Sequence, residues 1–127
     1  MGLNLVFVWG IISQHMKIIT ETLAPSELNQ MAAMFGNMVK AVVDVERELL
    51  AIDGELHSDL EALLLSDGSK QNNLWGINLY PEMNDEEFIE FDSIINIRPS
   101  RRNRSRGIED ERIRQKIIEI VAKRIKR

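Results

Sequence analysis

Residues 74–81 read Leu-Trp-Gly-Ile-Asn-Leu-Tyr-Pro, and this stretch decides the fold of the chain. Large apolar side chains at positions 75, 77 and 79 alternate with Gly, Asn and Tyr, and Pro81 ends the pattern. A period of two predicts a β-strand with one buried face. A second alternating run spans residues 89–97 and ends before Pro99. We predict two antiparallel strands joined across the acidic loop at residues 82–87.

The preceding part of the chain shows both extended and helical patterns. Residues 17–22 are β-branched, which predicts a strand, and a helix should then begin with Ser26 as its N-cap and end at Gly36. Residues 39–46 alternate and are rich in Val, which favours a strand. One long helix over residues 26–52 is the alternative, so the choice between strand and helix stays open for residues 38–52.

Two short signals follow this region. Asp53-Gly54 is typical of a tight hairpin turn and predicts that residues 48–52 pair with residues 55–57. Ser58 and Glu61 match a capping box, so a short helix should follow and end before Asp67.

The last element is predicted to be a helix over residues 109–127. Its first turn is acidic and its last turn is basic, as the helix macrodipole favours. Apolar residues at positions 113, 117, 120, 121 and 125 form one stripe that can pack on a sheet. The order of elements predicts an α+β fold: a single-domain two-layer sandwich with a mainly antiparallel sheet and helices on one face.

The composition bounds the chemistry. The chain has 127 residues, of which 44% are hydrophobic and 28% charged, and it has no Cys. One domain is expected at this length. Without cysteine the chain can have neither disulfides, nor thiolate metal sites, nor a Cys nucleophile, and a cytoplasmic location is expected. Asp, Glu and the two His remain as metal ligands.

Residues 1–15 differ from the remainder. The apolar run from residue 3 to residue 12 is about half as long as the ~20 residues that cross a membrane. No basic residue precedes it, as a secretory signal would require, so no membrane partner is predicted. We interpret residues 1–15 as a hydrophobic N-terminal extension that need not be native, with an edge strand or a partner-binding segment as alternatives. Residues 16–127 then form the single α+β domain.

Charge is unevenly distributed along the chain. Residues 1–97 hold four basic and sixteen acidic side chains, a net of −12, whereas residues 98–127 hold twelve basic and four acidic ones, a net of +8. Such asymmetry indicates either a basic arm for a polyanion or mutual attraction of the two parts, within one chain or between copies.

Five short motifs resemble an uncharacterised family of short prokaryotic proteins, a domain of unknown function. They are VKAVVDVE at 39–46, GELH at 54–57, LWGINLYP at 74–81, INIRP at 95–99 and NRS at 103–105. The resemblance runs from about Met16 to the C-terminus. Since no activity is established for that family, it implies no catalytic or binding residue. The arginines at positions 101, 102 and 106 make the loop more basic than the family pattern.

The alternation of the predicted strands suggests a polar, open face of the sheet. Its members would be Asp44, Glu46, Asn78, Tyr80, Glu90, Asp92, Asn96 and Arg98. The carboxylate pairs Asp44 with Glu46 and Glu90 with Asp92 are candidate ligands for Mg²⁺ or Mn²⁺, the only cofactors considered. A metal there could activate water for phosphoester hydrolysis, with Arg98 on the transition-state charge. The alternative is an ordinary solvated sheet face.

His57 is a candidate general base, because Glu55 and Asp59 flank it and could orient its imidazole. The candidate catalytic residues are therefore His57, Glu46 and Asp92. The alternative is an imidazole at a hairpin end that bonds to the backbone or to a neighbouring carboxylate.

The most unusual local feature is a basic loop. Arginines at positions 98, 101, 102, 104 and 106 fall within nine residues. Guanidinium groups match the geometry of phosphate. We predict that this loop and the polar face bind a phosphate-bearing ligand or RNA, through Arg98, Arg101, Arg104, Asn78, Tyr80, Asn96, Asn103 and Ser105. Solvated charge and an intermolecular salt-bridge interface are the alternatives.

Three classes of function therefore remain. The first is a small binding module, expected to be a homo-oligomer, for a phosphate-bearing small molecule or RNA. The second is a metal-assisted, nuclease-like hydrolase that uses the sheet-face carboxylates. The third is a scaffold or regulator that binds a protein partner. The fold class cannot choose between them, because such sandwiches host many functions.

Overall fold

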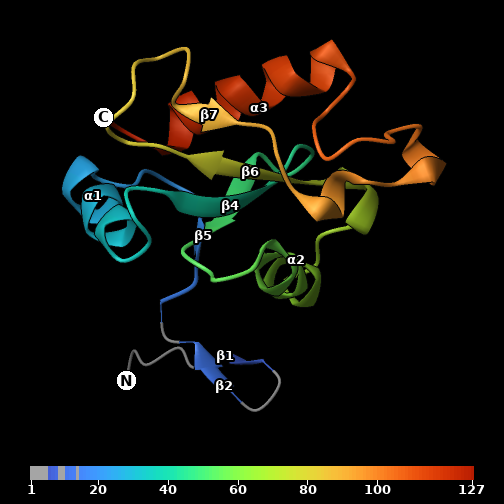
Figure 1. The fold of residues 1–127 in the computed structure, drawn as a ribbon. Coiled ribbons are helices and arrows are strands. Elements are labelled where there is room, and N and C mark those ends of the chain that lie inside the picture. Colours follow the sequence, from blue (N-terminus) through green and yellow to red (C-terminus); the bar gives the residue numbers. More distant parts are fainter. Residues whose placement is uncertain (1–5, 9–10, 14) are drawn as a thin grey trace.

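The computed structural model describes residues 6–8, 11–13 and 15–127, whose strands form two sheets (Figure 1). The larger sheet has the strand order β3-β5-β4-β6-β7, and each neighbouring pair is antiparallel. β1 and β2 pair with each other in a two-stranded sheet. The extension expected at residues 1–15 lies outside the described residues at positions 1–5, 9–10 and 14. In chain order the elements are β1 (Val6–Val8), β2 (Ile11–Ser13), β3 (Lys17–Ile19), α1 (Pro25–Ala33), β4 (Val39–Asp44), β5 (Leu49–Ile52), α2 (His57–Ser66), the 3₁₀ helix η1 (Gln71–Asn73), β6 (Leu74–Leu79), β7 (Ile89–Glu90), the 3₁₀ helices η2 (Ile94–Asn96) and η3 (Pro99–Arg101), and α3 (Glu111–Arg124).

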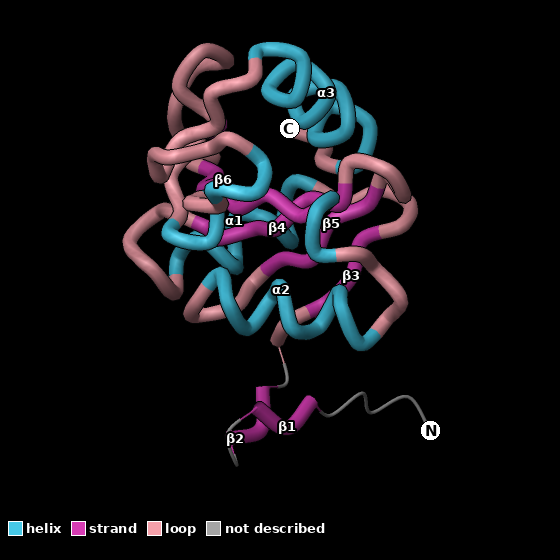
Figure 2. The backbone as a smooth tube through the Cα atoms, turned by 90° about the vertical axis from the view of Figure 1, so that its right-hand side faces the viewer, coloured by secondary structure: helices cyan, strands magenta, loops and turns pink. Residues whose placement is uncertain are grey.

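Side-chain alternation gives the five-stranded sheet two different faces. On β4, Val39 and Val43 belong to an apolar cluster that includes residues of α1 and α3, and we call this side the α3 face. Val42 belongs to a second cluster with Leu60 and Leu64 of α2, on the side that we call the α2 face. Figures 1 and 2 show α3 and α2 on opposite sides of the sheet. Full burial of each leucine contributes roughly 1.5–3 kcal/mol.

The α+β class, the single domain and the antiparallel sheet are confirmed. Residues 39–44 form the strand β4, so the long-helix alternative is wrong. The helices do not all lie on one face, because the leucine stripe of α2 needs apolar partners and finds them on the face opposite α3. A sequence signal for this exists: β5 reads Leu-Leu-Ala-Ile, and a strand without polar alternation is typical of burial on both faces.

The turn between β4 and β5 depends on a buried carboxylate. Asp44 Oδ1 accepts hydrogen bonds from the backbone N–H groups of Glu46 and Arg47, both at 2.9 Å, and Glu48 takes a positive φ of 57°. The hairpin therefore lies at residues 45–48. The hairpin expected at Asp53-Gly54 is wrong, because β5 already pairs with β4 and β3 and the chain leaves it for α2.

Two expected helix caps are also wrong. Helix α1 begins two residues earlier, with Ala24 as N-cap, and the Glu27 carboxylate accepts from the Ala24 N–H at 3.4 Å. Helix α2 has Leu56 as N-cap, which leaves Ser58 inside the helix. In contrast, Asp110 caps α3 by accepting from the Arg112 N–H at 2.8 Å.

The second predicted strand is shorter than expected. Only residues 89–90 pair with β6, and residues 94–96 form the 3₁₀ helix η2. Beyond β7, the Asn96 side chain takes the place of a strand: its Oδ1 accepts from Gly76 N at 2.8 Å and its Nδ2 donates to Gly76 O at 3.0 Å. A Cβ on Gly76 would lie 2.5 Å from the Cβ of Ser93. Only glycine at position 76 therefore lets this segment cross the sheet so closely.

The acidic and basic parts of the chain attract each other within the molecule. Lys116 and Lys123 of α3 pair with Glu48 at 2.8 and 3.3 Å, and Arg127 pairs with Asp85 at 2.7 Å. These contacts fix α3 and the C-terminal residues to the acidic body. Among the described residues, no helix combines the length and apolarity needed to cross a membrane.

Candidate functional site

Polar side chains form a row across three strands on the α2 face. The register of the sheet places Lys40 of β4 opposite Asn78 of β6, and Asn78 opposite Glu90 of β7. Residues from neighbouring segments surround this row. We call the group the polar cluster; it consists of Lys40, His57, Asn78, Tyr80, Glu90, Asp92 and Arg106.

Asn78 lies at the centre of the row and is 6% exposed. Its Nδ2 donates to Glu90 Oε1 at 2.9 Å and to the backbone oxygen of Asp92 at 3.2 Å. Tyr80 Oη also donates to Glu90 Oε1 at 2.9 Å. Burial, followed by the bond to Glu90, raises the pKa of Tyr80. Asn78 Oδ1 is buried and has no hydrogen-bond partner among the described residues.

Positive charge converges on Asp92 from the basic loop and from β4. Arg106 Nε donates to Asp92 Oδ1 at 2.7 Å, and this bond is the main cause of the lowered pKa of Asp92. Lys40 and His57 lie close enough to lower the same pKa further. The end of the basic loop therefore meets the polar face of the sheet at Asp92.

His57 is the first residue of α2 and is almost fully buried. Its Nε2 lies 2.8 Å from the carbonyl oxygen of Ile77. Because a carbonyl only accepts, Nε2 carries the proton and Nδ1 is the basic nitrogen. Burial lowers the pKa of His57, so the imidazole is neutral near pH 7. This geometry agrees with an imidazole bonded to the backbone.

The candidate metal ligands are not brought together. Asp44 and Asn78 lie near opposite ends of the β4–β6 ladder, and the four residue steps from Lys40 to Asp44 span about 13 Å of strand. Glu46 instead accepts from Asn73 Nδ2 at 3.3 Å. In the part of the chain that the structure describes, no three His, Asp or Glu side chains are grouped to hold a metal ion. The face that was expected to be open is not, because α2 packs on it and the segment at residues 93–96 lies against Gly76. Asp44, Asn78 and Asn96 are therefore buried.

Two arginines of the basic loop are bound internally. Arg98 forms an ion pair with Glu61 of α2 and donates from Nε to the Ile95 carbonyl at 2.9 Å. Arg101 lies 3.6 Å from the ring centroid of Trp75 and donates to the carbonyls of Asn72 and Leu74. Desolvation, with a smaller effect of Arg98, lowers the pKa of Arg101 to about 10. Both predicted ligand residues therefore hold the loop on the domain.

Asn103 organises the loop itself and is 2% exposed. Its Nδ2 donates to the carbonyls of Asn96, Ser105 and Gly107, and its Oδ1 accepts from Glu109 N at 2.8 Å. The Glu109 carboxylate accepts in turn from the N–H groups of Arg104 and Ser105.

The Glu109 carboxylate competes with the anion that was expected to bind in the basic loop. The two N–H groups that could hold an anion in the loop already bind Glu109, and the bond from Arg104 N is the main cause of its lowered pKa. Arg102 and Arg104 are exposed, and neither guanidinium has an ion-pair partner among the described residues. The side chains of Asn96 and Asn103 form hydrogen bonds inside the domain and stabilise the fold.

The sequence analysis missed the roles of Lys40 and Arg106. Lys40 was not among the candidate residues, and Arg106 was considered only as one charge of the loop. The signal for Lys40 is its register with Asn78, which comes from the pairing of two strands far apart in sequence and could not be read from either strand alone.

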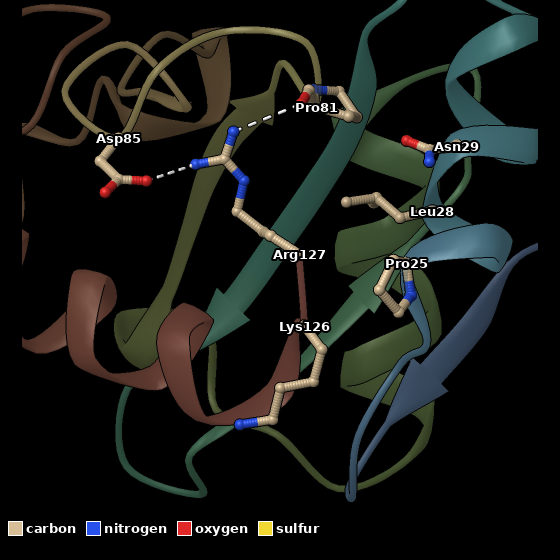
Figure 3. Close-up of a pocket in the computed structure, with 7 residues that line it drawn as sticks. All are labelled: Pro25, Leu28, Asn29, Pro81, Asp85, Lys126 and Arg127. Atoms are coloured by element: carbon tan, nitrogen blue, oxygen red, sulfur yellow. Dashed lines mark hydrogen bonds and ion pairs between the residues drawn. The ribbon is translucent and has the colours of Figure 1, made fainter.

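A cavity of about 290 Å³ lies elsewhere, between the start of α1, the loop after β6 and the C-terminal residues (Figure 3). Its lining residues are Pro25, Leu28, Asn29, Pro81, Asp85, Lys126 and Arg127. In Figure 3, Arg127 crosses the space and binds Asp85 and the carbonyl of Pro81. None of the residues predicted from the sequence lines it, because three distant segments create it.

Fold and site together define a small α+β domain with a charged polar cluster at one sheet edge. Residues 17–124 match the family described as "Protein of unknown function (DUF5674)", and the chain belongs to that family. Searches of curated proteins and of solved structures gave no match. The family assignment confirms the resemblance found in the sequence and brings no site residue with it.

Proposed function

We propose that this protein is a binding module that holds a small phosphate-bearing ligand at the polar cluster. One observation supports this most: two cations from distant parts of the chain flank Asn78. Strand register places Lys40 beside Asn78, and Arg106 is bonded to Asp92, whose backbone oxygen accepts from the Asn78 side chain. A phosphate between the two cations would gain charge-assisted hydrogen bonds from both.

The two cations would contribute differently. Lys40 has no ion-pair partner among the described residues, so its ammonium group can turn toward a ligand. Arg106 uses Nε on Asp92 and keeps its terminal nitrogens for a phosphate. Arg102 and Arg104 add positive potential nearby and would speed the approach of an anion.

A small ligand fits better than RNA. The chain has a net charge of −4, and several basic residues of the C-terminal part are paired with acidic ones. A long polyanion would need many free cations, because each neutralised phosphate contributes to affinity. One phosphate group needs only the two at the cluster.

The test is calorimetric titration with inorganic phosphate at two salt concentrations. Binding should weaken as salt rises, and Lys40→Met, which keeps an apolar stem and removes the charge, should weaken it about tenfold. Lys70→Met is the matched control, because Lys70 is exposed and lies outside the polar cluster. Unchanged affinity in Lys40→Met would overturn the proposal. Tight binding of a short RNA without measurable binding of phosphate would replace the small ligand by RNA.

The hydrolase hypothesis stays a prediction. The separation of its carboxylates does not favour it over the binding module. Its test is a rise of the unfolding midpoint on addition of Mn²⁺ or Mg²⁺ that Asp92→Asn abolishes. The protein-partner hypothesis and the homo-oligomer also stay predictions. Measuring the mass of the protein in solution, alone and with a partner, tests both.

A further inference from the structure

The centre of the polar cluster carries an acceptor that the chain itself does not use. Asn78 is 6% exposed, and its Oδ1 has no hydrogen-bond partner among the described residues. Buried polar atoms in native proteins are nearly always paired, and each exception calls for an explanation.

The orientation of this amide is fixed by its surroundings. A flipped side chain would point Oδ1 at Glu90 Oε1 and at the backbone oxygen of Asp92, which are both acceptors. Nδ2 therefore faces these two oxygens, and Oδ1 must receive a donor from the other side. The unpaired acceptor is therefore a property of the site.

The charges around Asn78 select the kind of donor. Lys40 is its register neighbour on β4, and Arg106 is bound to Asp92 beside it. A cationic amine on a ligand would be repelled by these two groups and would pair with the Glu90 carboxylate instead, whereas a neutral hydroxyl can donate to Asn78 Oδ1. A hydroxyl can also accept a bond from Lys40 while it donates to Asn78 Oδ1.

The size of the ligand follows from the strand register. Cross-strand neighbours have Cβ atoms about 5 Å apart, so a ligand whose phosphate and hydroxyl are only a few bonds apart can reach both Lys40 and Asn78. Glu90 Oε2 has no hydrogen bond among the described residues, and it can accept from a second, adjacent hydroxyl.

Resting on the function proposed above, we propose that the ligand of the polar cluster is a polyol phosphate. Its phosphate contacts Lys40 and Arg106, and a hydroxyl close to the phosphate donates to Asn78 Oδ1. The same hydroxyl phosphate chemistry occurs in free polyol phosphates and in the headgroups of glycerol-based lipids.

The experiment compares four ligands by calorimetric titration of the full chain: inorganic phosphate, glycerol 3-phosphate, n-propyl phosphate and glycerol. Glycerol 3-phosphate and n-propyl phosphate share a carbon skeleton and a phosphate and differ in two hydroxyls. Glycerol 3-phosphate should bind at least about tenfold more tightly, because the analogue leaves Asn78 Oδ1 unpaired. Glycerol alone should not compete at the same concentration.

Asn78→Leu removes the acceptor and should make the two phosphates bind equally. Asn72→Leu is the matched control, since Asn72 is exposed and offers only its backbone oxygen to Arg101. If Asn78→Leu fails to fold, as judged by circular dichroism, the ligand comparison on the unaltered chain still decides. Vesicles that contain phosphatidylglycerol test whether the ligand is a lipid headgroup. If the protein binds these vesicles but not glycerol 3-phosphate, the ligand is not a free polyol phosphate.

The outcomes separate the two proposals. Equal binding of both organic phosphates overturns the polyol and leaves the phosphate site intact. Absence of binding by all three phosphates overturns the phosphate site and the polyol with it. A preference for glycerol 3-phosphate that persists in Asn78→Leu overturns the assignment to Asn78.

Discussion

The two faces of the sheet differ in what they bury. On the α3 face, β6 contributes Trp75 and Ile77 to an apolar cluster with α1 and α3. On the α2 face, the same strand contributes Gly76 and Asn78, which contact polar side chains of β7 and of the segment that follows it. One strand thus supplies core packing on one side and a polar cluster on the other, so stability and candidate function can be changed separately.

The largest expected effect is on the α3 face. Trp75→Ala should lower the free energy of unfolding by about 3–5 kcal/mol, because it leaves a cavity and removes the ring beneath Arg101. Urea denaturation measures this change. Trp75→Phe keeps most of the apolar volume and should cost clearly less. A loss below about 1 kcal/mol for the alanine variant would show that this face is not the main core.

An intermediate effect is expected at the ion pair that joins the basic loop to α2. Arg98→Ala should destabilise the protein by about 2–3 kcal/mol, because it leaves Glu61, whose side chain is 13% exposed, without its partner. Arg104→Ala is the matched control from the same loop and should change stability by less than about 0.5 kcal/mol. Equal effects of the two variants in thermal unfolding would mean that the loop is not fixed through Arg98.

The smallest expected effect is the pH dependence that His57 adds on the α2 face. Burial lowers its pKa in the folded state, so the unfolded chain binds a proton more readily. Stability should therefore fall as pH drops below the ordinary histidine value of about 6.5, and level off below the folded pKa.

Unfolding midpoints between pH 8 and pH 5 measure this slope. His57→Gln can still donate to the Ile77 carbonyl and should flatten it. The lowered pKa values of Asp92, Glu48 and Glu109 act with the same sign but at lower pH, where these carboxylates protonate. If His57→Gln keeps the full pH dependence of the unfolding midpoint above pH 5, a group other than His57 causes that dependence.

Sequence reasoning succeeded where the signal is local. Alternation identified β6 and β4, and charged ends with an apolar stripe identified α3. It failed at residues 89–97, where polar alternation suggested a strand but side-chain bonds from Asn96 to Gly76 replace the ladder. It also failed at Asp53-Gly54, because a turn signal does not say which segments the turn connects.

For the candidate site, the sequence supplied the residue types and the tertiary structure supplied the partners. His57, Asn78, Tyr80, Glu90 and Asp92 were all candidates, and they meet at one edge of the sheet. Arg98, Asn96 and Asn103 were candidates too, but the fold uses their hydrogen-bonding groups internally.

The sequence by itself determined the strand β6, the helix α3 and the separation of acidic and basic charge, because these depend on neighbours a few residues away. It favoured a strand for β4, but only the pairing with β5 and β6 excluded the long helix. Only the tertiary structure decided that Lys40, Asn78 and Glu90 form a row and that Arg106 reaches Asp92. The reason is physical: strand register and the path of the loop are set by packing between distant segments, and no local pattern records them.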